Sequence, residues 1–182
     1  VDVLMFHAIV PSDDIAALEN GVYAEMRRLK EEGAVRFIGF SSMDSAERSR
    51  EAMERLDFDV ALLAMNPTGY GGFVTEALPA AREKDVGVLA MKVMRDIVGR
   101  AAGPEELIRY ALSQDGVASA LIGHHGLPTM EENIRIIQAI PADPAAGMKP
   151  DARRRLESRL AALAGPHALC WACPGYVDGV VG

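Results

Sequence analysis

Short apolar runs alternate with amphipathic stretches along this chain. The five runs cover residues 1–7, 35–40, 58–65, 86–91 and 117–122. Each is nearly continuous in apolar character, which is typical of strands buried on both faces of a parallel sheet. The residues that close the runs are polar or small: His7, Ser41 with Ser42, Asn66, Lys92 and Gly123. The first run opens the chain without a cap or lead-in, so we expect it to be a strand cut out of something longer.

Helical patterns separate these runs. Their signals are apolar spacing, capping residues and prolines in a first turn. We expect helices around Val22 to Leu29 (with Gly33 as the stop), after Asp44 or Ser45, after Thr75, from Pro104, after Thr129, and over about 150–163. For the fifth of these, Thr129 and Glu132 have the spacing of a capping box.

Five strand–helix units in succession predict an α/β protein with a parallel sheet. Two architectures compete, a doubly wound open sheet and part of a (β/α)8 barrel. A dinucleotide-binding open sheet would carry a glycine-rich turn after its first strand. Here the first run is followed by His-Ala-Ile-Val-Pro at residues 7–11, without glycine. The pattern therefore favours part of a barrel.

Composition narrows the classes of function. The chain has 182 residues, 49% hydrophobic and 25% charged, with a net charge of −7. An acidic chain without a basic cluster beside aromatic residues argues against nucleic acid and anionic membrane as partners. The basic triplet at residues 153–155 is interpreted as a solvated helix face. Only two cysteines occur, both near the C-terminus, so we expect no disulfide framework and a reducing, cytoplasmic setting.

Four blocks of the chain resemble the aldo-keto reductase family. Residues 2–7 resemble its fourth barrel strand, 29–41 its helix and fifth strand, 83–92 its seventh strand, and 120–133 its eighth strand and the start of the following helix. The resemblance implies a TIM (β/α)8 barrel of which five βα units, strands four to eight, are present. It divides the chain into a partial barrel over residues 1–148 and a C-terminal helix with a Cys-containing tail over residues 149–182.

The same resemblance implies reduction of a small-molecule carbonyl to an alcohol with NADPH or NADH. Charge develops on the carbonyl oxygen during such a reaction, so a proton donor and an oxyanion stabiliser must stand beside it. His7 matches the family's catalytic histidine at the end of the fourth strand. The family's Tyr, Lys and Asp belong to earlier strands and have no counterpart in this chain. We therefore expect this fragment alone to be inactive.

The resemblance also implies a set of cofactor-binding positions. The candidates are Ser41, Ser42, Met91, Lys92, Gly123, Glu132 and Asn133. Ser41 and Ser42 stand where the family holds the nicotinamide amide, and Met91 stands where a tyrosine often stacks. Lys92 either faces a cofactor phosphate or is solvated at the rim, and Glu132 either faces the adenine or serves only as a helix cap. Thr129 replaces an arginine that contacts the 2′-phosphate, so the choice between NADP and NAD stays open.

The C-terminal tail resembles a subgroup with a ferredoxin-like extension. Cys170 and Cys173, followed by Pro174, match the end of a ferredoxin cysteine motif. A [4Fe–4S] cluster needs four thiolates, so an iron–sulfur cluster is not expected in this chain. Two further hypotheses stand beside the reductase. One is a non-catalytic half-barrel that self-associates through open sheet edges, and the other is a redox or metal module built on the two cysteines.

Overall fold

The structure is a computed structural model that describes residues 1–94, 102–141 and 147–163. Its strands are β1 (Val3–Phe6), β2 (Phe37–Ser42), β3 (Val60–Ala64), β4 (Gly87–Met91) and β5 (Val117–Ala120). Its helices are α1 (Ile15–Asn20), α2 (Val22–Glu31), α3 (Ala46–Arg55), α4 (Leu78–Glu83), α5 (Pro104–Leu112), α6 (Leu127–Gln138) and α8 (Pro150–Leu160). Short helical turns are η1 (Tyr70–Gly72), the π-helical η2 (Phe73–Ala77) and η4 (Ala161–Leu163). No described helix combines the length and the apolar character needed to cross a membrane.

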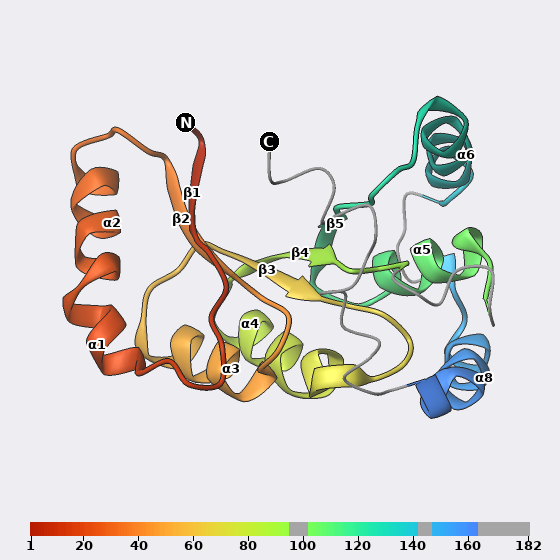
Figure 1. Cartoon of the computed structure of the whole chain (residues 1–182), viewed down its shortest axis with the longest axis horizontal. Coiled ribbons are helices and arrows are strands. Elements are labelled where there is room, and N and C mark those ends of the chain that lie inside the picture. Colours follow the sequence, from red (N-terminus) through yellow and green to blue (C-terminus); the bar gives the residue numbers. More distant parts are fainter. Residues whose placement is uncertain (95–101, 142–146, 164–182) are drawn as a thin grey trace.

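The five strands form one parallel sheet in the order β1-β2-β3-β4-β5. Each strand pairs with the next one along the chain, as in a barrel wall. The helices follow an arc around the outside of the curved sheet, from α2 through α3 and α4 to α5 (Figure 1). The expected α/β architecture with five barrel-type units is therefore confirmed.

The two faces of the sheet differ in burial. On the helix-covered face, Ile38, Phe40, Leu63 and Val88 are at most 1% exposed. Side chains alternate between faces along a strand, so their neighbours point to the concave face. There Phe37 is 39% exposed, and Val60, Leu62, Leu89 and Met91 are half-buried. Within the described residues, β1 and β5 each have a ladder partner on one side only.

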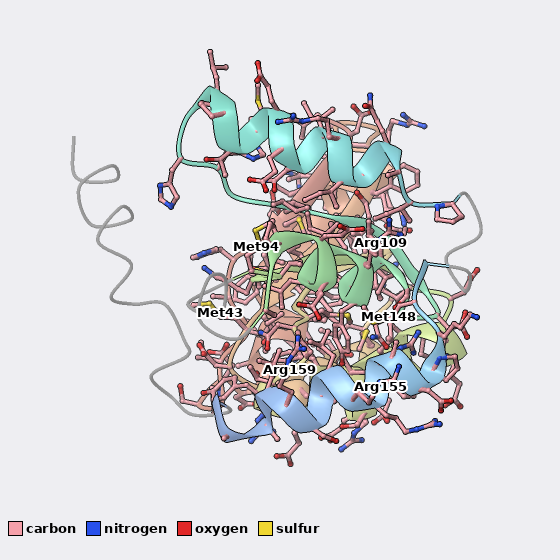
Figure 2. All side chains as sticks on the ribbon, turned by 90° about the vertical axis from the view of Figure 1, so that its right-hand side faces the viewer. Met43, Met94, Arg109, Met148, Arg155 and Arg159 are labelled. Carbon is pink, nitrogen blue, oxygen red and sulfur yellow. The ribbon has the colours of Figure 1, made fainter. Side chains whose placement is uncertain are left out.

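Helix α8 docks on α5 through a buried apolar pair and several polar contacts. Leu156 and Leu160 are at most 3% exposed. The Tyr110 hydroxyl donates to Glu157 Oε1 at 2.9 Å. Burial and the nearby Glu157 carboxylate raise the pKa of Tyr110. Figure 2 views this side of the molecule and shows Arg155 and Arg159 along α8.

The basic triplet in α8 is only partly the solvated face expected from the sequence. Arg154 and Arg155 are exposed. Arg153, in contrast, is half-buried and donates to the Ser113 carbonyl at 2.5 Å and to Gln114 Oε1 at 3.2 Å. It therefore satisfies backbone and side-chain oxygens at the C-terminal end of α5, and for Arg153 the expectation was wrong.

Candidate functional site

The candidate site lies along the carboxyl edge of the sheet, because all five parallel strands end there. The residues that the sequence singled out stand at or just after these ends: His7 after β1, Ser41 and Ser42 in β2, Met91 and Lys92 at the end of β4, and Gly123 after β5. In barrel enzymes this edge carries the active site. Residues separated by more than a hundred positions are therefore gathered on one rim.

His7 is exposed and directly follows β1. The ladder between β1 and β2 pairs Met5 with Gly39 and Phe6 with Phe40. Continuing this register sets His7 beside Ser41. Strand alternation places His7 on the concave face together with Met5.

The loop after His7 is tied to the end of β2 by three hydrogen bonds. Ala8 N–H donates to Ser41 Oγ at 2.9 Å, and Ile9 N–H donates to the Ser41 carbonyl at 2.8 Å. The Ser42 hydroxyl donates to the Ile9 carbonyl at 2.7 Å. Ala8 has a φ of 62°, a left-handed conformation that costs a residue with a Cβ about 1–2 kcal/mol. These bonds hold the chain in a conformation that it would otherwise avoid.

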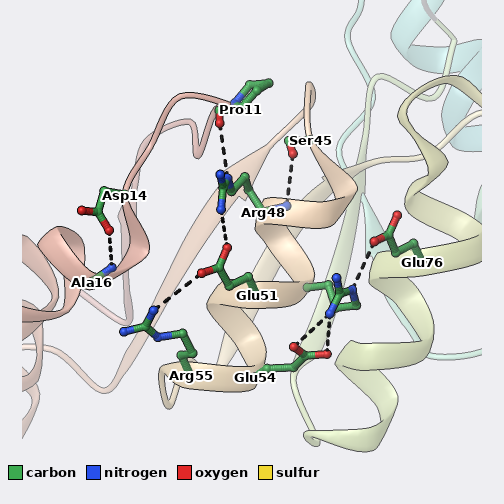
Figure 3. Close-up of polar contacts among 10 residues, drawn as sticks. Pro11, Asp14, Ala16, Ser45, Arg48, Glu51, Glu54, Arg55 and Glu76 are labelled. Atoms are coloured by element: carbon green, nitrogen blue, oxygen red, sulfur yellow. Dashed lines mark hydrogen bonds and ion pairs between the residues drawn. The ribbon is translucent and has the colours of Figure 1, made fainter.

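Helix α3 supports the same loop from outside. Ser45 caps the helix by accepting from Arg48 N–H at 3.1 Å. The Arg48 guanidinium then donates through Nε to the Pro11 carbonyl at 3.3 Å and pairs with Glu51 at 2.5 Å (Figure 3). Glu51 in turn lies 3.6 Å from Arg55. The loop between β1 and α1 is thus held by β2 on one side and by α3 on the other.

Methionines and a buried amide lie at the ends of β3 and β4. Met91 is half-buried and pairs with Ala64 across the ladder. Lys92 follows with a φ of 57°, and its carbonyl accepts from Asn66 Nδ2 at 3.4 Å. Asn66 also accepts the Thr68 hydroxyl at 2.5 Å. Met43, after β2, and Met94, after β4, are partly buried against the core, and Figure 2 labels both on the side that it views.

At the end of β5, two residues nine positions apart in the sequence meet. Asn133 on α6 is 1% exposed, and its Nδ2 lies 3.2 Å from Nδ1 of His124. Its Oδ1 is buried and has no partner among the described residues. Glu132 beside it is exposed, and Gly123 has open space around the position of a Cβ. An orphan amide oxygen of this kind is available to a donor only after a local rearrangement.

The expected capping box at Thr129 and Glu132 is wrong. Helix α6 begins three residues earlier, at Leu127, with Gly126 instead of Thr129 as its N-cap and with Pro128 in its first turn. Thr129 lies inside the helix, and its hydroxyl donates back to the His125 carbonyl at 3.3 Å. Proline fixes its own φ at a helical value and needs no N–H partner, so Pro128 moves the start of the helix upstream. Glu132 is consequently free of a capping role.

The metal hypothesis falls largely outside the described residues. Cys170 and Cys173 lie in the segment 164–182, which the structure does not describe. Within the described ranges, no group of three or more His, Cys, Asp or Glu side chains is placed to hold a metal ion. His124 and His125, two adjacent imidazoles that could contribute to a metal site, therefore gain no third ligand from the described part of the chain.

Sequence reasoning missed two features of the rim. The Asn66–Thr68 cluster has a local signal, since Asn-Pro-Thr-Gly at residues 66–69 is a sequence rich in turn residues. The hydrogen bond from the Ser42 hydroxyl to the Ile9 carbonyl has no signal in the sequence. The two residues are 33 positions apart, and neither a motif nor a periodicity connects them. Long-range hydrogen bonds of this type appear only once the strand register is known.

Comparison with known proteins agrees with this architecture. The model of the aldo/keto reductase family matches residues 1–96. Among solved structures, the aldo-keto reductase AKR11C1 from Bacillus halodurans in its holo form is 17% identical, with a TM-score of 0.65. The match covers 93% of this chain and 64% of that one. The thermostable aldo-keto reductase Tm1743, solved in complex with the inhibitor epalrestat, is 14% identical, with a TM-score of 0.63.

The Tm1743 match covers 87% of this chain and 60% of that one, so the chain spans less than two thirds of either solved structure. No curated protein matches the sequence. The family model nevertheless covers more than half of the chain, including His7, both serines of β2 and Met91 with Lys92. The chain belongs to the aldo/keto reductase family.

Proposed function

We propose that this chain forms the C-terminal five βα units of an NAD(P)H-dependent oxidoreductase that reduces a small-molecule carbonyl to an alcohol. The observation that carries the proposal is the single rim on which His7, Ser41 and Met91 stand at the ends of β1, β2 and β4 of one parallel sheet. Residues 1–148 are assigned to the barrel portion, and residues 149–182 to the C-terminal helix and tail. A cytoplasmic setting remains part of this proposal.

The proposed chemistry needs a group that orients the carbonyl and stabilises charge on its oxygen. Bound NADPH or NADH would supply the hydride. The His7 imidazole, exposed at the end of β1, would hydrogen-bond the carbonyl oxygen. The half-buried side chain of Met91 is polarisable and would pack against the nicotinamide ring.

The remaining residues are assigned to the cofactor. Among the described residues, the Ser41 Oγ accepts a hydrogen bond from Ala8 N–H and donates none. Its O–H would therefore donate to the nicotinamide amide. Gly123 offers open space for close approach. Glu132 would face the adenosine end, and the unpaired amide oxygen of Asn133 would accept from it after a local rearrangement. Lys92 would stand near a phosphate. These residues fit a dinucleotide only in part. The Ser42 hydroxyl, expected to hold the nicotinamide amide, instead donates to the Ile9 carbonyl.

Turnover requires a proton donor, and we assign none among the residues that the structure describes. Tyr23 is 5% exposed and Tyr110 is 1% exposed, so both serve packing, and the family resemblance gives no such role to Tyr70. We therefore propose that the isolated chain binds the cofactor without reducing a carbonyl. Carbonyl-dependent oxidation of NADPH by the purified 182-residue chain would contradict this statement.

A binding titration tests the proposal directly. NADPH and NADH fluorescence would be followed on addition of the purified chain, of Asn133→Ala, and of the exposed neighbour variant Glu131→Ala as control. We expect Asn133→Ala to weaken binding by roughly tenfold, equivalent to about 1.4 kcal/mol. Glu131→Ala should leave the affinity within twofold. The absence of any cofactor binding by the unaltered chain would refute the proposed function.

A second candidate function is that of a non-catalytic half-barrel that assembles through its uncovered surfaces. It is favoured by the exposed apolar residues near β5 and along α6, where Leu121 is 49% exposed and Leu127 is 67% exposed. Open strand edges and exposed apolar surface promote association. A third candidate, a redox or metal module on Cys170 and Cys173, would be removed if anaerobically purified protein contains neither iron nor zinc.

A further inference from the structure

We propose that Ser42 is a positioning residue that fixes the loop following His7 and does not contact the cofactor. Ser41, its neighbour in β2, would contact both the loop and the cofactor. This inference rests on the proposed function, in which His7 faces the carbonyl. It departs from the simple expectation that both serines hold the nicotinamide amide.

The Ser42 hydroxyl is buried, and the chain itself uses its donor capacity. Its side chain is 0% exposed. Its single hydroxyl proton is donated to the Ile9 carbonyl at 2.7 Å, and the Ser45 carbonyl lies 3.4 Å from the same oxygen. A hydroxyl that is buried and has already donated its proton cannot donate to a ligand. Ser42 is therefore excluded from direct cofactor contact in this structure.

Ser41 has a different hydrogen-bond pattern. Its Oγ accepts from Ala8 N–H at 2.9 Å, and within the described part of the chain the hydroxyl donates to no acceptor. Ser41 stands on the concave face beside His7, whereas Ser42 stands on the opposite face of β2, towards the helices. One serine can thus serve the loop and a ligand together, while its neighbour serves the loop alone.

The loop needs this support because it is strained and because His7 immediately precedes the strain. Phe6 before His7 is held in the ladder, and Ala8 after it has a left-handed φ of 62°. Ser41 fixes Ala8 from one side, and Ser42 fixes Ile9 from the other. Arg48 adds a third anchor at Pro11 (Figure 3). With both neighbours fixed, the backbone of His7 has little freedom, and its Cα–Cβ bond keeps one direction relative to the rim.

A matched serine serves as the control. Ser49 on α3 is also 0% exposed, and its hydroxyl donates to the Ser45 carbonyl at 2.7 Å. Ser49→Ala therefore removes a buried hydroxyl of the same kind without touching the His7 loop. Any effect of Ser42→Ala beyond that of Ser49→Ala reports on the loop.

The test compares Ser42→Ala, Ser41→Ala and Ser49→Ala in the full 182-residue chain. We expect Ser42→Ala to accelerate amide hydrogen exchange at Ile9 and Ala8 by at least tenfold relative to Ser49→Ala. It should also shift the NMR signal of the His7 ring, assigned with His7→Gln. NADPH affinity should change by less than twofold in Ser42→Ala and should fall by about fivefold or more in Ser41→Ala. Ser42→Thr, which keeps the hydroxyl, should restore the slow exchange and the His7 signal.

Two results would overturn the proposal. One is unchanged exchange at Ala8 and Ile9 in Ser42→Ala. The other is a loss of NADPH affinity in Ser42→Ala as large as that in Ser41→Ala, since this would make Ser42 a cofactor ligand. If the unaltered chain binds no NADPH, the proposed function fails, yet the exchange and His7 measurements still decide whether Ser42 positions the loop. If Ser42→Thr does not fold, the comparison with Ser49→Ala alone decides.

Discussion

Lys30 Nζ lies 2.7 Å from both carboxylate oxygens of Asp59, and this pair joins α2 to the residue that precedes β3. Asp59 Oδ2 also accepts from Ile38 N–H at 2.8 Å. One carboxylate thus links a helix and two strands at the amino edge of the sheet, opposite the rim that carries His7. At this edge of a barrel, such contacts serve stability rather than chemistry.

Asp59→Ala should lower the free energy of unfolding by about 1.5–3 kcal/mol, because hydrogen bonds to charged groups contribute amounts of this order. The control is Asp2→Ala. Asp2 pairs with Arg36 at 2.8 Å, but both side chains are at least 70% exposed. Exposed pairs contribute about 0–1 kcal/mol. Urea denaturation of both variants checks the difference, and equal losses would contradict the assigned role of Asp59.

Gly39→Ala should be strongly destabilising, whereas Gly87→Ala should be tolerated. A Cβ on Gly39 would overlap the Val60 carbonyl oxygen of the paired strand, and backbone cannot move aside as a side chain can. A Cβ on Gly87 would instead meet its nearest neighbour, the Asp59 carbonyl, at an ordinary 3.5 Å. We expect a loss of about 2–4 kcal/mol for Gly39→Ala, somewhat above ordinary overpacking. Thermal melts of the two variants test this, and similar melting temperatures would show that β2 and β3 can separate without cost.

Acid should weaken the contact between α5 and α8. The Arg159 guanidinium, 2.7 Å from Glu106, lowers the pKa of that carboxyl below its ordinary 4.5, and the Gly103 N–H acts in the same direction. A lowered folded-state pKa stabilises the fold above the unfolded pKa, and this stabilisation is lost as pH falls through the folded value. Because Glu106 is 46% exposed, the effect should stay below about 1 kcal/mol. The difference in unfolding free energy between the unaltered chain and Glu106→Gln should therefore shrink below pH 4.5, and a constant difference would contradict the assignment.

Alkaline pH should act through Tyr110. Its raised pKa means that the folded chain holds the phenolic proton more tightly than the unfolded chain does. This stabilisation is complete below the unfolded pKa of 10.0 and is lost as pH rises through the folded value. Tyr110→Phe removes the titration and the hydrogen bond to Glu157, at a cost of about 0.5–1.5 kcal/mol near neutral pH. In Glu157→Gln the repulsive carboxylate is absent, so the ultraviolet titration of Tyr110 should move to lower pH; no movement would exclude that cause.

Lysine substitutions on α6 should reduce self-association. Ile134 and Ile137 are each 43% exposed and lie one turn apart. Charged side chains at these positions remove apolar surface without opening the core. Size-exclusion chromatography over a range of concentrations should show Ile134→Lys with Ile137→Lys eluting later than the unaltered chain. Identical, concentration-independent elution as a monomer would exclude these two residues as an association surface.

The strands were predictable because their signal is local. The continuous apolar runs predicted five strands, and the described residues contain a strand at each of the five expected places, although β2 extends to Ser42 rather than ending at residue 40. The extension arises because Ser41 and Ser42 pair with Leu62 and Leu63 of the next strand. Helix α1 and the π-helical turn η2 were not foreseen, since neither carries a strong apolar period. The parallel ladder was inferred from the βα alternation and is confirmed.

The candidate site was predictable only in outline. The position of His7, Ser41 and Met91 at strand ends follows from the apolar runs, and the roles proposed for them come from the family resemblance. The state of each side chain does not follow from either. The hydrogen bond from the Ser42 hydroxyl to the Ile9 carbonyl depends on the register of β1 and β2. The contact between Asn133 and His124 depends on where α6 lies. Such details are fixed by packing between distant segments, which leaves no periodic trace in the sequence.

The sequential strand order also bears on how this chain reaches its native state. The described ladders join strands that are consecutive in the chain: Val3 pairs with Phe37, Phe40 with Ala61, and Val88 with Val117. Every new strand can therefore dock on one that has just left the ribosome, without waiting for a distant partner. Pairing of consecutive strands limits the loop closed at each step to a single βα unit, and so limits the loop entropy lost there. The sheet can be assembled unit by unit during synthesis, starting from whichever strand is made first.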